Sequence, residues 1–149
     1  MQTVAFIGID PGKNGAWACL QGDKITVGTD VKSCRWFMAT LPRWCPEVLL
    51  ERVSASPQMG VSSAFTFGSE YGKWLGLLGE DVDQITPQKW QFWYMKNGFR
   101  GTLEGIKGPA RKLALKGIAE KLFPKFKVNL TNADALLLSY FLKANHESK

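Results

Sequence analysis

The chain has few of the residues on which many enzyme sites depend. It holds three cysteines, none in a Cys-x-x-Cys pair, and a single histidine, His146, near the end of its 149 residues. Zinc sites need clusters of Cys and His, and a Ser-His-Asp triad needs a histidine beside its nucleophile. We therefore expect neither kind of site, and we interpret the cysteines as buried, reduced thiols.

Long apolar runs are also missing. No stretch of about 18 apolar residues exists, and the start, Met1-Gln2-Thr3, lacks the basic residues that open a signal peptide. We therefore expect no membrane span and a cytoplasmic location. With 45% hydrophobic and 21% charged residues and no linker or repeat, residues 1–149 are expected to form one domain with a hydrophobic core.

The net charge of +6 is unevenly distributed. Residues 1–94 carry 8 Lys/Arg against 9 Asp/Glu, whereas residues 95–149 carry 11 against 4. A basic excess confined to one third of a chain favours a polyanionic partner such as nucleic acid. Solvated, lysine-rich helix faces would give the same composition, so charge alone leaves both interpretations open.

Hydrophobic patterning predicts a mixed α/β sheet. Strands are expected at residues 4–9, 15–20, 24–28, 48–53 and 82–86. Helices are expected at residues 31–41, at 62–78, from Pro87, at 109–122 and at 131–144. Short turns join the first three strands, which predicts antiparallel neighbours, and the later strands alternate with helices, as in parallel crossovers. The fold class is therefore α/β, with a mixed five-stranded sheet flanked by helices.

Three glycines lie four residues apart in the predicted helix at 62–78. Gly68, Gly72 and Gly76 therefore share one helix face. Each costs roughly 1 kcal/mol of helix stability relative to alanine, so we expect a compensating close contact on that face. The partner in this contact is either the chain's own sheet or a second subunit.

Three carboxylates are candidates for chemistry, although each also has a purely structural explanation. Asp10 ends the first strand before a Pro-Gly turn, where aspartate is a common turn residue. Glu51 lies in an apolar strand, where a salt bridge to Arg52 would balance its charge. Asp134 lies at the start of the last helix, and Thr131-x-x-Asp134 resembles a capping box with Thr131 as the N-cap.

The three carboxylates gain meaning as a set. Mg²⁺ binds oxygen ligands and keeps several waters, so a few converging carboxylates suffice to hold it. Two such ions about 4 Å apart activate a water and stabilise the leaving oxygen at a phosphodiester. This chemistry needs neither histidine nor cysteine, which agrees with what the chain lacks.

Six short segments, spread from about residue 7 to residue 138, form an ordered pattern. They are Gly8-Ile9-Asp10-Pro11-Gly12-x-x-Gly15, Leu49-Leu50-Glu51-Arg52-Val53, Gln58-x-Gly60-x-x-Ser63-x-x-Thr66-Phe67-Gly68-x-x-x-Gly72, Thr86-Pro87-x-x-Trp90, Leu122-Phe123-Pro124 and Ala133-Asp134-Ala135-Leu136-Leu137. In this order they resemble the motifs of RuvC-type Holliday junction resolvases of the RNase H-like superfamily. The short chain, without a separate module, resembles the phage members more than the larger bacterial enzymes.

The resemblance implies an RNase H-like fold, a homodimer, and paired nicks across a four-way DNA junction. It implies two Mg²⁺ or Mn²⁺ ions per active site, no nucleotide cofactor, and Asp10, Glu51 and Asp134 as catalytic metal ligands. A phage source would place the protein in the cytoplasm of a bacterial host. The family commonly has a fourth acidic or histidine residue two or three positions before the closing aspartate, where this chain has Asn132 and Thr131. Asn132 offers an uncharged carbonyl oxygen and is a weaker candidate ligand.

Basic and aromatic side chains are the candidate DNA contacts. The basic ones are Lys96, Arg100, Lys107, Arg111, Lys112 and Lys116. Lys112 and Lys116 share a helix face, and either is also a weaker candidate for an electrostatic stabiliser at the scissile phosphate. Phe65 and Phe67, shortly after Glu51, are candidates to contact unstacked bases. Trp90 and its aromatic neighbours are interpreted as core and interface residues.

Three alternatives to a four-way junction nuclease remain open at this point. The same site would serve a nuclease for flaps, forks or RNA–DNA hybrids. Asn132, in place of a charged residue, would fit a catalytically silent junction-binding protein. Asp10-Pro11-Gly12 alone would fit an ATP-binding protein of the actin-like fold, although no second phosphate loop is present.

Overall fold

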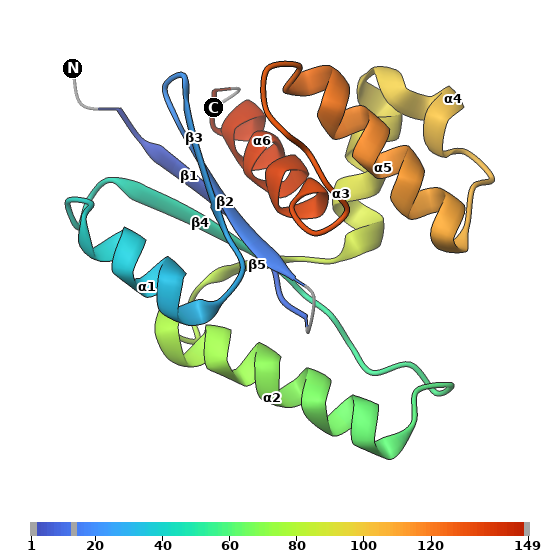
Figure 1. Cartoon of the computed structure of the whole chain (residues 1–149), viewed down its shortest axis with the longest axis horizontal. Coiled ribbons are helices and arrows are strands. Elements are labelled where there is room, and N and C mark those ends of the chain that lie inside the picture. Colours follow the sequence, from blue (N-terminus) through green and yellow to red (C-terminus); the bar gives the residue numbers. More distant parts are fainter. Residues whose placement is uncertain (1–2, 13–14, 148–149) are drawn as a thin grey trace.

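The computed structural model describes residues 3–12 and 15–147 and contains one five-stranded sheet with helices on both faces (Figure 1). The strands are β1 (Ala5–Asp10), β2 (Ala16–Gln21), β3 (Lys24–Gly28), β4 (Pro46–Glu51) and β5 (Asp83–Ile85). Their order across the sheet is β3-β2-β1-β4-β5. The first three strands are antiparallel neighbours, whereas β4 pairs in parallel with β1 and with β5. The predicted mixed sheet is confirmed. Lys13 and Asn14 of the predicted turn lie outside the described residues.

The helices lie close to their predicted positions, apart from a short fourth helix that the sequence did not predict. They are α1 (Val31–Ala39), α2 (Val61–Leu78), α3 (Pro87–Tyr94), α4 (Arg100–Leu103), α5 (Gly108–Leu122) and α6 (Ala133–Glu147). Pro87 occupies the start of α3, as predicted, and the Thr86 side chain accepts a hydrogen bond from the backbone N–H of Lys89. An irregular segment at 95–99 then separates α3 from α4, because Gly98 has a φ of 108° that a helix cannot contain. No helix in the described part of the chain is long and apolar enough to cross a membrane.

Alternating side chains of the central strands build two cores. Ile7, Ile9 and Leu50 pack towards α1 and α2 on one face of the sheet. Leu49 packs on the other face, in a core with residues of α3, α5 and α6. Figure 1 shows these two layers of helices on opposite sides of the sheet. The cysteines are all buried and free, as expected, and burial raises the pKa of Cys19 to about 12, so its thiol is protonated at neutral pH.

Helix α6 approaches β1 very closely at Gly8. A Cβ atom added there would lie 2.6 Å from the carbonyl oxygen of Ala135 and would also clash with the backbone nitrogen of Ser139. The helix therefore rests directly on the strand backbone, and any side chain at this position would push it away. This contact fixes the first turn of α6, with Asp134 in it, near the end of β1.

Of the two partners considered for the α2 glycine face, the chain's own sheet is excluded, and the second subunit is the one that the family resemblance favours. A Cβ atom added at Gly68, Gly72 or Gly76 would meet no heavy atom of the described residues within 4 Å, beyond the helix's own backbone. The sheet-facing side of α2 is instead the side that carries Trp74, which is buried. A second subunit as the partner of the glycine face stays a prediction.

Replacing Gly8 with alanine should destabilise the protein severely. The added methyl group must displace α6 from β1, and overpacking of a rigid backbone contact costs about 3 kcal/mol or more. Gly117→Ala is the matched control, because Gly117 lies inside α5 with no described atom near its Cβ position. That change should stabilise the protein by up to about 1 kcal/mol. Urea unfolding followed by circular dichroism measures both, and equal effects of the two changes would contradict the close contact.

Candidate active site

Asp10 and Glu51 lie at the ends of two neighbouring parallel strands. Ile9 pairs with Leu50 across β1 and β4, and each of these residues immediately precedes one of the carboxylates. Because Ile9 and Leu50 both point into the α1–α2 core, strand alternation directs Asp10 and Glu51 to the opposite face, where α6 lies. Asp134 is in the first turn of α6. Three segments that are far apart in the sequence therefore bring their carboxylates to one corner of the sheet.

The pKa values of all three carboxylates are raised, chiefly by burial. Burial, with the charge of Asp134, raises the pKa of Asp10 to about 7. Burial, with the charges of Asp10 and Asp134, raises the pKa of Glu51 to about 8. Burial also raises the pKa of Asp134. A buried cluster of like charges is unfavourable unless a proton or a cation balances it.

The donor set fits hard divalent cations in its chemistry. All three groups offer carboxylate oxygens, which are the ligands that Mg²⁺ and Mn²⁺ prefer. Within residues 3–12 and 15–147, however, no three Asp, Glu, His or Cys side chains are already drawn together around a single point where an ion would fit. A two-ion site does not require this, because different ions are held by different pairs of carboxylates.

Lys112, in α5, is the basic residue that all three carboxylates share. Its positive charge lowers the pKa of Asp10, of Glu51 and of Asp134, in opposition to burial. Lys116, one turn further along α5, instead lies 3.7 Å from the carboxylate of Glu120. The structure therefore separates the two lysines that the sequence could not distinguish, and it sets Lys112 beside the carboxylates.

Trp90 is the site residue that sequence reasoning missed. Its indole N–H donates a hydrogen bond of 2.7 Å to Oε2 of Glu51. Trp90 is fully buried and Glu51 is 5% exposed, so the bond is shielded from water and fixes one carboxylate oxygen. The Thr86-Pro87-x-x-Trp90 motif was the available signal, but we interpreted Trp90 as a core residue.

Asn132 holds the loop before α6. Its Oδ1 accepts the N–H of Asn129 at 2.9 Å, and its own N–H donates to Oδ1 of Asn129 at 2.8 Å. This reciprocal pair lies directly before α6, so the predicted capping box with Thr131 as N-cap is wrong. The side-chain amide of Asn132 also donates to the carbonyl of Lys127 at 3.4 Å. A role for Asn132 as a metal ligand stays a prediction, and the hydrogen bonds show a structural role for its side chain.

The other basic candidates differ in how far their side chains are free. Arg111 donates from Nε to Gln91 at 2.6 Å and from Nη1 to the carbonyls of Leu103 and Ile106, so it braces α5 against α3 and α4. Arg100 pairs with Glu104 at 3.5 Å on the surface. The ammonium of Lys96 lies 4.8 Å from the ring centre of Phe92, and Lys107 immediately precedes α5. DNA contact by these residues stays a prediction.

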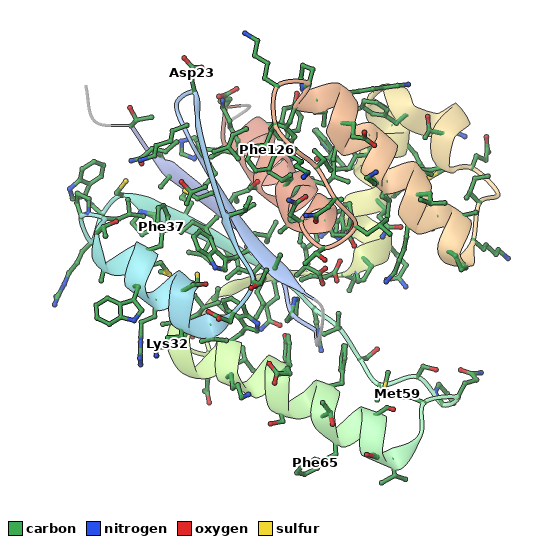
Figure 2. The ribbon with its side chains drawn as sticks, viewed as in Figure 1. Asp23, Lys32, Phe37, Met59, Phe65 and Phe126 are labelled. Carbon is green, nitrogen blue, oxygen red and sulfur yellow. The ribbon has the colours of Figure 1, made fainter. Side chains whose placement is uncertain are left out.

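The two candidate phenylalanines face different surroundings. Phe65 is 79% exposed and extends from α2 away from the rest of the molecule (Figure 2). Phe67 is half-buried and lines two hollows, one with residues 52–54 beside the end of β4 and one with Met59 at the start of α2.

Comparison with known proteins supports the fold. No protein-family model matches the chain, and no curated protein matches it in sequence. The solved structure of T. thermophilus RuvC in complex with a Holliday junction substrate is similar, with a TM-score of 0.55 and 18% sequence identity. The match covers 99% of this chain and 96% of that one. The chain therefore has the RNase H-like fold in the RuvC arrangement. Likeness to the phage members stays a prediction.

The stability of the metal-free protein should fall as the pH rises. The folded-state pKa values of Asp10 and Glu51, about 7 and about 8, lie above their ordinary values of 3.8 and 4.5. Their contribution is fully present below about pH 4, where both states are protonated, and is lost as the pH rises through 7 to 8. Thermal unfolding in EDTA between pH 4.5 and 8.5 measures this decline.

Asp10→Asn tests the origin of that decline. It removes one charge from the cluster, so it should flatten the pH dependence and stabilise the protein at pH 8 by about 1–4 kcal/mol. Added Mg²⁺ or Mn²⁺ should raise the melting temperature of the unchanged protein at pH 8 more than that of Asp10→Asn. An identical pH slope in both proteins would show that the carboxylates do not repel one another in solution.

Proposed function

We propose that this protein is a metal-dependent DNA endonuclease that resolves four-way junctions by paired nicks on opposed strands. The convergence of Asp10, Glu51 and Asp134 at the end of the central strands carries the proposal. Support for the substrate comes from the RuvC fold, whose similar solved structure holds a Holliday junction, and from the basic last third of the chain. Fold alone does not define a function, so the site has to supply the argument.

Each site residue has a role that its surroundings allow. Asp10, Glu51 and Asp134 hold the cations, two per active site. When bound, Mg²⁺ or Mn²⁺ activates a water for attack on the phosphodiester and neutralises the leaving oxygen. Lys112 contributes positive charge beside the phosphate, where charge accumulates during the reaction. Trp90 keeps one oxygen of Glu51 fixed without adding a positive charge that would compete with the cations.

The DNA is bound by the basic surface of the last third. Lys96, Arg100, Lys107 and Lys116 contact phosphates in this proposal, and Arg111 supports the segment that carries Lys107. Each phosphate contact releases counterions, so the affinity falls steeply as salt concentration rises.

A homodimer formed through the glycine face of α2 would place one active site on each of two opposed DNA strands. Val61 is 89% exposed and lies on the same helix face as Phe65 and the three glycines. No described residue covers the glycines of this apolar face. A second copy of the helix could approach closely there, which would offset the cost of the glycines in the helix.

Asp10→Asn, Glu51→Gln and Asp134→Asn should each abolish cleavage while leaving junction binding intact. Loss of several kcal/mol of transition-state stabilisation predicts at least about a 100-fold fall in the single-turnover rate. Labelled four-way junctions with Mg²⁺ or Mn²⁺ measure cleavage, and gel shift without divalent metal measures binding. Asp81→Asn, at an exposed carboxylate outside the site, is the control and should cut normally.

The substrate panel separates the proposal from its alternatives. Flaps, forks and RNA–DNA hybrids are tested beside the junction, and faster cleavage of any of them would replace the four-way junction as the substrate. Tight junction binding without any metal-dependent cleavage would instead identify a silent junction-binding protein. In that case Asn132→Asp, which adds the missing charge, tests whether position 132 is the cause.

Gly72→Gln should weaken the dimer. The long side chain fills the space through which the second helix approaches, and we expect the dimer dissociation constant to rise at least about tenfold, equivalent to about 1.4 kcal/mol. Sedimentation velocity over a concentration series measures it. Gly117→Gln makes the same change inside α5, where an added Cβ also meets no described atom within 4 Å, and should leave self-association unaltered. A protein that is monomeric at all concentrations, or a Gly72→Gln dimer of normal affinity, would contradict this interface.

A further inference from the structure

Helix α1 and the turn that follows it display two exposed tryptophans. Trp36 is 67% exposed and Trp44 is 53% exposed. Each directly follows an arginine, so the dipeptide Arg-Trp occurs twice, at 35–36 and at 43–44. Single exposed apolar residues are common on protein surfaces, but a repeated pairing of a cation with an indole needs an explanation.

The stretch that carries these tryptophans is basic and contains no acid. Residues 31–46 include Lys32, Arg35 and Arg43 and no Asp or Glu, whereas the rest of residues 1–94 carries 5 Lys/Arg against 9 Asp/Glu. The three basic residues are exposed, and none of them forms an ion pair with another described residue. This part of the surface is therefore complementary in charge to a polyanion.

Ordered backbone holds both Arg-Trp pairs in place. Trp36 lies within α1, which Phe37 anchors by stacking on Trp17 with 4.9 Å between ring centres. Trp44 lies in the turn at 42–45, which a backbone hydrogen bond of 2.9 Å closes and a second one of 3.0 Å ties to β1. A ligand would therefore meet indole surfaces whose backbone is already ordered, which lowers the cost of binding.

The two tryptophans lie apart from the candidate active site. Helices α1 and α2 cover one face of the sheet, and α6, which carries Asp134, covers the other (Figure 1). Trp44 comes shortly before β4, whereas Glu51 is the last residue of that strand. At about 3.3 Å per residue, the two ends of β4 are about 17 Å apart. The carboxylate chemistry therefore does not account for the exposed indoles.

A hollow of about 750 Å³ between α1 and α2 continues this surface. Lys32 and Arg35 line it from α1. Its two acidic residues already have partners, because Asp30 accepts a backbone N–H at 2.6 Å and Glu70 pairs with a lysine of α2 at 2.8 Å. A phosphate that enters the hollow beside Trp36 would therefore meet two cations that form no ion pair.

We propose that this surface binds single-stranded DNA. We call it the Arg-Trp surface, and it consists of Lys32, Arg35, Trp36, Arg43 and Trp44. Its cations contact phosphates and its indoles stack on bases, a combination that tolerates any base sequence. An acidic protein would also complement the charge, but the centre of a protein interface is apolar and depleted in charged residues. Here cations alternate with indoles along the chain, as phosphates alternate with bases along a strand.

The Arg-Trp surface goes beyond the proposed nuclease activity. It would hold a single-stranded segment on the α1–α2 side of the sheet, while a junction occupies the basic last third of the chain on the other side. The protein would then have two DNA sites of different specificity, one for branched duplex DNA and one for single strands.

Binding of fluorescently labelled oligo(dT) tests the proposal. Affinity is measured by fluorescence anisotropy in EDTA, so that no strand is cut. Trp36→Leu and Trp44→Leu should each weaken binding at least about fivefold, because each removes a stacking surface. Trp36→Phe retains a flat ring and should keep most of the affinity. Arg43→Gln should reduce the slope of log affinity against log salt by about 0.7, the value for one phosphate contact on a single strand.

Matched controls keep the test specific. Phe65→Leu removes a ring that is 79% exposed in a stretch, residues 53–72, without Lys or Arg, and it should leave oligo(dT) binding unchanged. Neither leucine substitution at a tryptophan should alter the affinity for a four-way junction. An excess of unlabelled junction should not displace the labelled oligo(dT). Thermal melts of all variants exclude misfolding as the cause of weak binding.

Three results would overturn the assignment. Unchanged oligo(dT) affinity in both leucine variants would refute the stacking role of the tryptophans. Displacement of oligo(dT) by the junction would place the single strand on the basic last third. Tighter binding of a peptide of alternating Glu and Leu, lost in both leucine variants, would identify an acidic protein as the partner instead.

The test is independent of whether the protein cuts DNA. Cleavage of junctions by a protein whose oligo(dT) binding ignores both tryptophans would refute the Arg-Trp surface and leave the proposed function standing. Tryptophan-dependent binding of oligo(dT) by a protein that never cuts would retain the surface and refute the nuclease.

Discussion

The burial of three neighbouring carboxylates, in whole or in large part, is the constraint around which the site is built. A protein ordinarily disperses such charges or pairs each with a base, because burial without a partner is costly. Here Lys112 offers a shared positive charge, and Trp90 stabilises Glu51 by a neutral hydrogen bond. Neither contact neutralises the cluster. The unbalanced negative charge is what a divalent cation would relieve, so the cost in stability and the proposed capacity for metal have one origin.

The cluster exists because backbone contacts force it. Asp10 and Glu51 share a face through the register of β1 against β4, and Asp134 joins them because α6 rests on the bare backbone at Gly8. The Asn129–Asn132 pair fixes the turn through which the chain enters α6. Placement of the charges thus depends on two local features without charge, a glycine and a reciprocal amide pair. Preorganisation of this kind is what allows a site to hold groups that repel one another.

The sequence predicted most of this fold and only part of the site. Alternating and continuous apolar runs located every strand to within a few residues. This works because burial of one face or of both faces of a strand requires apolar residues at fixed spacings. The carboxylates emerged only as a set, from resemblance, since each alone was better explained as a turn, a salt bridge or a cap. The Trp90–Glu51 bond was not predictable, because it joins residues 39 positions apart and depends on how α3 packs against the sheet end. The reciprocal Asn129–Asn132 pair before α6 was also missed, because Thr131-x-x-Asp134 offers the more familiar capping pattern in the sequence.

The two sides of α2 carry two features that showed no relation to each other in the sequence. The outer side presents glycines that nothing described covers, and the inner side presents Phe67 to a hollow whose lining includes residues 52–54, directly after Glu51. In the proposed dimer, one rigid helix would therefore both set the distance between two active sites and form a wall of the hollow beside each of them. Selectivity for a branched substrate would follow from this geometry rather than from the carboxylates, which meet the same phosphodiester in any DNA.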